Sequence, residues 1–286
     1  MVKRKKIINP PTLRKTLSEA KSKIVVGNRG QHLRHAWVFK RLSLNDQLSS
    51  TDFHHNALIL GSNLVSAKAI EYWAELFKLV EGRQVTEFGR QTLIELMKED
   101  SKATFLYWHW LAFAYGCQNA VMHFTFNIFN RAQFTKKELQ ESCFDWCQEQ
   151  GIKTSLNAVG TEVNGLLKTY AVNQAIEDQS PLSAILIDTY LREDSEVFCF
   201  TNRNILRQPK ILSRVFAEYL QILKIERINL QAACYRPESP GKIYCMAPWE
   251  LEKHLDINQE VYGAQGLSLE VSEQELFLVQ EHSVSD

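Results

Sequence analysis

The sequence lacks the motifs by which many enzyme families are identified. It contains no glycine-rich phosphate loop, no G-x-S-x-G turn, no H-E-x-x-H helix and no set of kinase motifs. His32 and His35 lie close together, as do His54 and His55, but neither pair has a carboxylate or cysteine partner at a useful spacing. We therefore expect no catalytic residues, no metal site and no cofactor, with a nuclease as the enzymatic alternative.

A secretory leader and an unbroken apolar span are also missing. The start, MVKRKK, has no apolar stretch of signal-peptide length, so we expect a cytoplasmic protein whose six cysteines are free thiols. Cys143 and Cys147 are spaced to share a helix face, but no second Cys/His pair stands at zinc spacing, which favours core thiols over a metal site. Residues 103–130 carry no Asp, Glu, Lys or Arg, yet residues 116–119 (GCQN) interrupt them, which favours two buried elements over a membrane span.

Charge is unevenly distributed, although the net charge is zero. Residues 1–41 hold twelve Lys and Arg against one acid, Glu19, a net charge of +11. Residues 246–286 hold nine acids against Lys253, a net charge of −8. A basic arm can neutralise nucleic-acid phosphates and release their counterions. The alternative is a solvated tail, or an arm that folds against the acidic end of its own or a neighbouring chain.

Apolar residues recur at helical spacing along most of the chain. This pattern predicts a mainly α fold with a minor β component, multi-helical, with winged helix-turn-helix-like units and short β-hairpins. We expect five segments: a basic N-terminal arm (1–30), a winged-helix-like domain (31–100), a helical middle domain (101–179), a C-terminal winged-helix-like domain (180–257) and an acidic tail (258–286). Within the fourth segment, residues 242–246 are expected to form a strand.

Residues 61–90 have the order of elements that is typical of a winged helix-turn-helix. After the initial glycine, Ser62 or Asn63 can cap a helix that extends to about Val80, with apolar residues at three- and four-residue steps. A short extended stretch with a glycine follows, and Thr86 can cap a further helix. The helix after the glycine turn is therefore the predicted DNA-reading helix.

The expected DNA contacts are polar and basic residues of this helix, of the wing and of the preceding basic segment: Asn63, Ser66, Lys68, Arg83, Arg90, Arg34, Lys40 and Arg41. Helix–glycine–helix units also occur in proteins that bind no nucleic acid. Glu71 and Glu75 would repel phosphate if they faced the groove. DNA contact and a purely structural role both stay open for this helix.

A second nucleic-acid-facing unit is predicted in the middle of the chain. Thr135 and Glu138 have the spacing of a capping box before a helix that runs to Gln150, and an amphipathic helix follows over residues 157–170. Lys153, Lys168, Ser155 and Asn157 lie around the start and end of that second helix. The aromatic residues of this region lack interleaved cations, which favours core packing over base stacking.

Several short motifs follow one another in a fixed order along the chain. They are GQHLRHAW (30–37), LGSNLV (60–65), YW (72–73), VTEFG (85–89), WHW (108–110), LKTY (167–170) and SPGKIY (239–244). Together they resemble the family called domain of unknown function 4007, over roughly residues 30–255. Two departures stand out: the Glu-Thr-Phe usual after the first His is absent, and Glu162 stands near a position usually held by Asp.

This family is bacterial and often encoded beside DNA phosphorothioation (Dnd-type) and related phage-defence genes. The resemblance thus implies a DNA-modification context and supplies no catalytic residue. We expect a non-catalytic DNA-binding accessory or regulatory protein of such a defence system, with duplex DNA and phosphorothioation-system proteins as partners. The alternative is a protein-interaction adaptor that docks onto the modification enzymes through its helical body and acidic tail.

Overall fold

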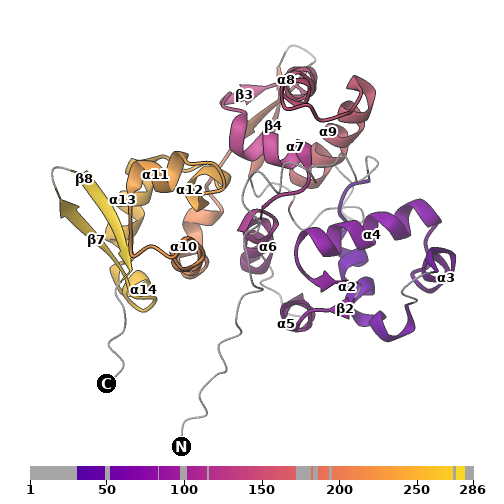
Figure 1. The fold of residues 1–286 in the computed structure, drawn as a ribbon, viewed down its shortest axis with the longest axis horizontal. Coiled ribbons are helices and arrows are strands. Elements are labelled where there is room, and N and C mark those ends of the chain that lie inside the picture. The colour runs from indigo at the N-terminus through magenta and orange to yellow at the C-terminus, as the bar shows by residue number, and fades with distance from the viewer. Residues whose placement is uncertain are drawn as a thin grey trace, which may run out of the picture.

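The computed structural model describes residues 31–48, 52–82, 84–96, 102–114, 116–171, 182, 186–192, 195–272 and 275–280. Its elements form three groups around a central helix, α6 (Lys102–Ala114) (Figure 1). The fold is mainly helical with small antiparallel sheets, as the sequence predicts.

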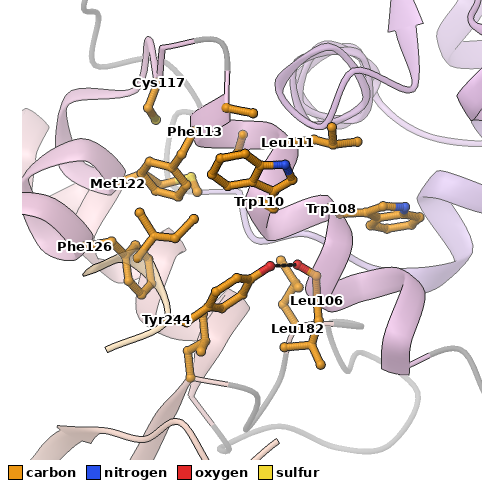
Figure 2. Packing of buried hydrophobic residues seen from close by; sticks show 14 of the residues in the cluster. Leu106, Trp108, Trp110, Leu111, Phe113, Cys117, Met122, Phe126, Leu182 and Tyr244 are labelled. Atoms are coloured by element: carbon orange, nitrogen blue, oxygen red, sulfur yellow. Dashed lines mark hydrogen bonds between the residues drawn. The ribbon is translucent and has the colours of Figure 1, made fainter. Parts of the chain in front are cut away.

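Helix α6 is buried because residues 103–114 are uncharged all round. Trp108, Trp110 and Phe113 are fully buried, and the Tyr244 hydroxyl donates a 2.8 Å hydrogen bond to the Leu106 carbonyl oxygen (Figure 2). The prediction of two buried elements in the uncharged run is confirmed, since α7 (Ala120–His123) begins the second one. Among the described helices, none has the length and apolar character needed to cross a bilayer.

The N-terminal group contains three helices, a two-stranded hairpin and a fourth helix. In chain order these are α2 (His35–Ser43), the short turn η1 (Asn45–Gln47), α3 (Phe53–Ile59), α4 (Leu64–Leu76), β1 (Val80–Glu81), β2 (Gln84–Val85) and α5 (Glu87–Leu96). The Asp52 carboxylate caps α3, and the Asn63 side chain accepts a hydrogen bond from the Ser66 amide to cap α4. Gly61, at φ +60°, makes the turn between the two helices. Helix α4 ends at Leu76, four residues before the predicted end near Val80, and Val80 lies in β1 instead.

The middle group joins elements from distant parts of the chain. They are α7, the π-helical turn η2 (Phe124–Ile128), β3 (Gln133–Phe134), α8 (Lys136–Glu149), α9 (Leu156–Tyr170), β4 (Ile187–Arg192) and β5 (Ser195–Phe200). The three strands form an antiparallel sheet in the order β3-β5-β4, in which Phe134 lies opposite Phe198. The expected boundary between residues 179 and 180 is therefore corrected, because β4 and β5 belong with β3.

The C-terminal group repeats the same order of helices and strands. Its elements are η4 (Ile205–Arg207), α10 (Pro209–Leu223), β6 (Arg227–Asn229), α11 (Leu230–Tyr235), α12 (Pro240–Ile243), α13 (Pro248–Ile257), α14 (Gln259–Gly263), β7 (Leu267–Ser272) and β8 (Glu275–Gln280). The strands form an antiparallel sheet in the order β6-β8-β7. In both groups the first strand pairs with the third. The described helices between the first and second strands are α8 and α9 in the middle group and α11, α12, α13 and α14 in the C-terminal group.

Two sequence predictions in this group are wrong. Residues 242–246 do not form a strand: Ser239 caps the short helix α12, whose first position is Pro240. Residues 258–286 are not a patternless acidic tail, because α14 and the β7–β8 hairpin occupy 259–280 and Leu278 is fully buried in the core. The described acids of this segment, Glu260, Glu270 and Glu275, lie on α14, β7 and β8.

Candidate nucleic-acid interface

Helix α4, the predicted reading helix, offers few polar side chains to a ligand. Asn63 is exposed, but its side-chain oxygen already accepts from the Ser66 amide at 2.8 Å. Lys68 is half-buried, and its ammonium lies 5.5 Å from the centre of the Phe53 ring, against α3. The polar groups chosen from the sequence are thus used largely to build the turn between α3 and α4.

Arg41 is not a surface residue, and its prediction as a DNA contact is corrected. Its side chain is 1% exposed and forms a two-point ion pair with Glu71: Nε to Oε2 at 2.5 Å and a second guanidinium nitrogen to Oε1 at 3.1 Å. Another nitrogen of the guanidinium donates to the Asn45 side-chain oxygen at 3.1 Å. The pair joins α2 to α4 and neutralises Glu71, which answers the concern that Glu71 would repel phosphate.

Lys40 and Arg34 lie on or just before α2, near the turn that precedes α4. The Lys40 ammonium is exposed and donates to the Leu60 carbonyl oxygen at 3.2 Å, which helps to end α3. The Arg34 guanidinium lies 4.9 Å from the centre of the Trp37 ring. Both side chains retain some exposure, so both stay predicted phosphate contacts.

Arg90 lies on α5, behind the β1–β2 hairpin. Its side chain is 63% exposed, pairs with Glu87 at 3.1 Å, and donates to the Val85 carbonyl oxygen at 3.2 Å. Arg83 falls outside the described residues. The N-terminal group also exposes five acids: Asp46, Asp52, Glu75, Glu81 and Glu87. This surface is therefore mixed in charge.

Helix α9 differs from the N-terminal group because it exposes no acid. Its apolar face is buried through Val159, Val163 and Leu166, and its only acid, Glu162, is 2% exposed. The outer face carries uncharged polar residues and one cation: Asn157, Thr161, Asn164 and Lys168. Asn157 and Lys168 belong to the second unit predicted from the sequence, whereas Thr161 and Asn164 were missed. Their spacing of four, three and four residues is the pattern that identifies one helix face.

Helix α13 differs from both. Trp249 and Ile257 are 65% and 70% exposed, and the acids Glu252 and Asp256 lie on the same helix with Lys253. His254 faces inwards, with its ring nitrogens bonded to the Tyr262 hydroxyl and the Leu206 carbonyl oxygen. The exposed face of α13 is thus apolar and acidic.

The buried ionisable groups of the core are enclosed by protein and contribute to packing. His109 is fully buried between the Tyr170 hydroxyl and the Ile243 carbonyl oxygen, and burial lowers the pKa of its ring to about 3. Cys143 and Cys147 are buried, as expected for core thiols. Within the described residues, no three His, Cys, Asp or Glu side chains are grouped as metal ligands.

Comparison with known proteins identifies the fold. Two solved structures match, titled "Magnesium ion-bound SspB crystal structure" and "SspB crystal structure", each with a TM-score of 0.72. They are 15% and 14% identical to this chain, cover 91% and 92% of it, and are themselves covered to 85%. No curated protein matches. The family model described as "Protein of unknown function (DUF4007)" matches residues 30–283, nearly the whole chain, and the protein therefore belongs to the DUF4007 family.

Proposed function

We propose that this protein is a non-catalytic DNA-binding accessory or regulatory protein of a bacterial DNA phosphorothioation-type defence system. The observation that carries the proposal is the repeated order of elements. The middle and C-terminal groups each contain a strand, then helices (α8 and α9 in the one, α11 to α14 in the other), then a hairpin, with the strands ordered first-third-second. The N-terminal group has the α3–α4 turn followed by a hairpin. We interpret the three groups as winged helix-turn-helix-like units, a type of unit that places one helix in the major groove of DNA.

The biological context rests on the family. The motifs that resemble DUF4007 carry an association with phosphorothioation and phage-defence genes, and membership in that family supports the context for this chain. Proteins that act on modified or foreign DNA need a DNA-binding part, and several winged units in one chain supply one. The same context suggests proteins of the modification system as partners.

Binding to duplex DNA over a series of salt concentrations tests the proposal. We expect the logarithm of the association constant to fall linearly with the logarithm of salt, by ~0.9 for each phosphate neutralised. Fluorescence anisotropy of a labelled duplex, titrated with the full chain, measures this slope. A slope near zero, or no binding at ~50 mM salt, would contradict the proposal.

A protein-interaction adaptor is the second candidate, and the exposed face of α13 favours it. Trp249 and Ile257 are exposed on this helix beside Glu252 and Asp256. Exposed aromatic residues are enriched in protein–protein contacts. The partner that fits is a protein of the modification system whose contact surface is apolar and flanked by Lys and Arg.

The adaptor can be tested without truncating the chain. Deleting residues 256–286 would remove β8, which pairs with β6, so the loss of a partner would then report unfolding. The double substitution Trp249→Ala and Ile257→Ser changes only exposed side chains. Loss of co-purification with co-expressed modification enzymes would support the adaptor, and unchanged co-purification would count against it.

A nuclease is the function that the proposal leaves out. One of the similar solved structures contains magnesium, according to its title. Incubation of the purified chain with supercoiled plasmid and Mg²⁺ decides the question. We expect the plasmid to stay supercoiled, and metal-dependent nicking or cutting would overturn the non-catalytic proposal.

A further inference from the structure

The three winged units present three different surfaces at the same position of the fold. In each group the last long helix before the hairpin is the one that a winged unit would place against DNA: α4, α9 and α13. α4 exposes the acid Glu75, and α13 carries Glu252 and Asp256 beside Trp249. Only α9, among these three helices, has no carboxylate on its outer face.

We infer that the outer face of α9 is the surface that lies in the major groove of duplex DNA, with the first turn of α8 on the adjoining phosphates. This inference rests on the proposed DNA-binding function and names the element that performs it. It moves the principal contact from the region around residues 61–90 to residues 131–168.

The composition of the α9 face fits the edges of bases. Asn157, Thr161, Asn164 and Lys168 form one stripe along the whole helix. Carboxamide and hydroxyl groups both donate and accept hydrogen bonds, and Asn pairs with adenine and Lys with guanine in the major groove. The face is polar and has one exposed apolar side chain, Leu156, so it lacks the apolar centre of a protein–protein interface.

Cations lie next to this stripe. Lys136 and Lys137 occupy the first two positions of α8 and are exposed, and the Lys136 ammonium donates to the Asn164 side-chain oxygen at 3.1 Å. Lys153, in the turn between α8 and α9, is also exposed. Lysines beside a reading helix typically contact phosphates and set its register.

Among these lysines, Lys137 pairs with an acid of α8, whereas Lys136 bonds to Asn164 on α9. Glu138 is held by the Thr135 amide and hydroxyl and by Arg131, which keeps its pKa below the ordinary value. Glu141 lies 3.8 Å from the Lys137 ammonium, with Asp145 and Glu149 in the later turns of α8. Lys136 and Gln140, in the first turns of α8, donate hydrogen bonds to α9.

The orientation of α9 is fixed by its close packing on α8. The Gln140 side-chain amide donates to the Leu156 carbonyl oxygen at 3.0 Å. A Cβ at Gly160 would lie 2.4 Å from the same amide nitrogen, so a larger residue there would displace the Gln140 side chain. The buried face of α9 points into the core, and the stripe from Asn157 to Lys168 points away from it. Base-reading side chains need such a rigid support.

The test compares two matched pairs of lysine substitutions. Lys136→Ala with Lys168→Ala removes two cations from the α9 surface, and Lys210→Ala with Lys253→Ala removes two exposed cations from the C-terminal group. With a labelled duplex as the probe, we expect the first pair to weaken binding ~10-fold or more and to lower the salt slope by roughly 2. The second pair should leave both nearly unchanged.

A second comparison probes the reading face directly. Thr161→Glu places a carboxylate in the middle of the stripe, whereas Gln231→Glu adds the same charge on α11. We expect Thr161→Glu alone to abolish binding while its thermal unfolding stays that of the wild type, because position 161 is exposed. Selection from a random duplex library with Asn157→Ala and Asn164→Ala should yield a different preferred sequence from the wild type.

The outcomes distinguish a failure of the proposed DNA-binding function from a failure of its assignment to α9. If the wild-type chain binds no duplex, the proposed function itself fails. If it binds, but the α9 variants lose no more affinity than their controls, the assignment to α9 is overturned and the proposed function stands. If Thr161→Glu removes only the binding of a purified partner protein, the α9 face is a protein-docking surface and the inference is equally overturned.

Discussion

At the scale of single residues, hydrogen-bonding chemistry was the most predictable part of the molecule. Asn63, one of two candidate caps, and the Thr135–Glu138 capping box cap their helices as the sequence predicts, because such caps depend on residues only a few positions apart. Arg41 shows where this reasoning fails. Its partner Glu71 is thirty positions away on another helix, and nothing local distinguishes a buried, paired arginine from a DNA-binding one.

His109 gives a residue-scale prediction about pH. Its two hydrogen bonds, to the Tyr170 hydroxyl and the Ile243 carbonyl oxygen, hold a neutral ring, and burial lowers its pKa from 6.5 to about 3. The unfolded chain therefore takes up a proton that the folded chain refuses as the pH falls below about 6.5. The free energy of unfolding should decrease by ~1.4 kcal/mol per pH unit from this group, between its unfolded and folded pKa values.

Urea denaturation at pH 7 and pH 5 measures the effect. His109→Gln keeps one donor and one acceptor but has no titrating ring, so it should be less stable than the wild type at pH 7. The difference should shrink by on the order of 2 kcal/mol at pH 5. An offset for His109→Gln that does not depend on pH would refute the argument.

At the scale of elements, helices with a clear apolar face were predicted well, and short elements were not. The capped, periodic helices α8 and α9 appear within one residue of their expected bounds, whereas α4 ends four residues earlier than expected. A strand was expected at residues 242–246, but Pro240–Ile243 forms the helix α12. A segment of about four residues carries too little periodicity to distinguish a helix from a strand. Apolar and polar residues do alternate in β7, with Leu267, Leu269 and Val271 at every second position. The strand was not predicted because the segment around it is acidic.

Gly89 explains part of one family motif, VTEFG, at the level of element packing. A Cβ at this position of α5 would lie 2.2 Å from the Leu79 carbonyl oxygen and 2.9 Å from a Val85 methyl carbon. The contact is with backbone, so Gly89→Ala must push α5 away from the hairpin, at a cost of about 1–3 kcal/mol. Thermal denaturation should show the loss.

Gly263, in helix α14, is the matched control. Nothing lies within 4 Å of a Cβ built there, so Gly263→Ala should be neutral or stabilise the chain by up to ~1 kcal/mol. Equal melting temperatures for the two alanine variants would show that Gly89 is not needed for close packing.

At the scale of the whole molecule, pairing between distant segments was beyond the sequence reasoning. β3 and β5 are joined across more than sixty residues, so the middle group is completed by strands that a linear reading assigned to the next domain. The recurrence of one strand order in two groups becomes visible only once these pairs are known. Contacts between distant segments also explain why α9 was predicted only as a second site. Its polar stripe can be recognised as one surface only when the positions of α8 and the hairpin are known.

The junction between α6 and α10 holds the C-terminal group to the rest of the molecule. Glu218 accepts hydrogen bonds from the Tyr107 hydroxyl at 2.7 Å and the Trp110 indole at 3.0 Å, and pairs with Arg214 at 2.8 Å. The Arg214 guanidinium also lies 4.0 Å from the centre of the Tyr107 ring. Three side chains from two helices thus share one carboxylate.

Glu218→Ala should loosen this junction more than it perturbs either group. The substitution leaves two largely buried donors without their acceptor, each at a cost of about 1–3 kcal/mol.

Because one apolar core runs through all three groups, we expect the wild-type chain to unfold in urea as a single transition by both tryptophan fluorescence and far-UV circular dichroism. In the variant, fluorescence should change first, since Trp110 lies at the junction. Glu260→Ala removes an exposed carboxylate from α14 and should behave like the wild type. Coincident, unshifted transitions in Glu218→Ala would mean that apolar packing alone joins the groups.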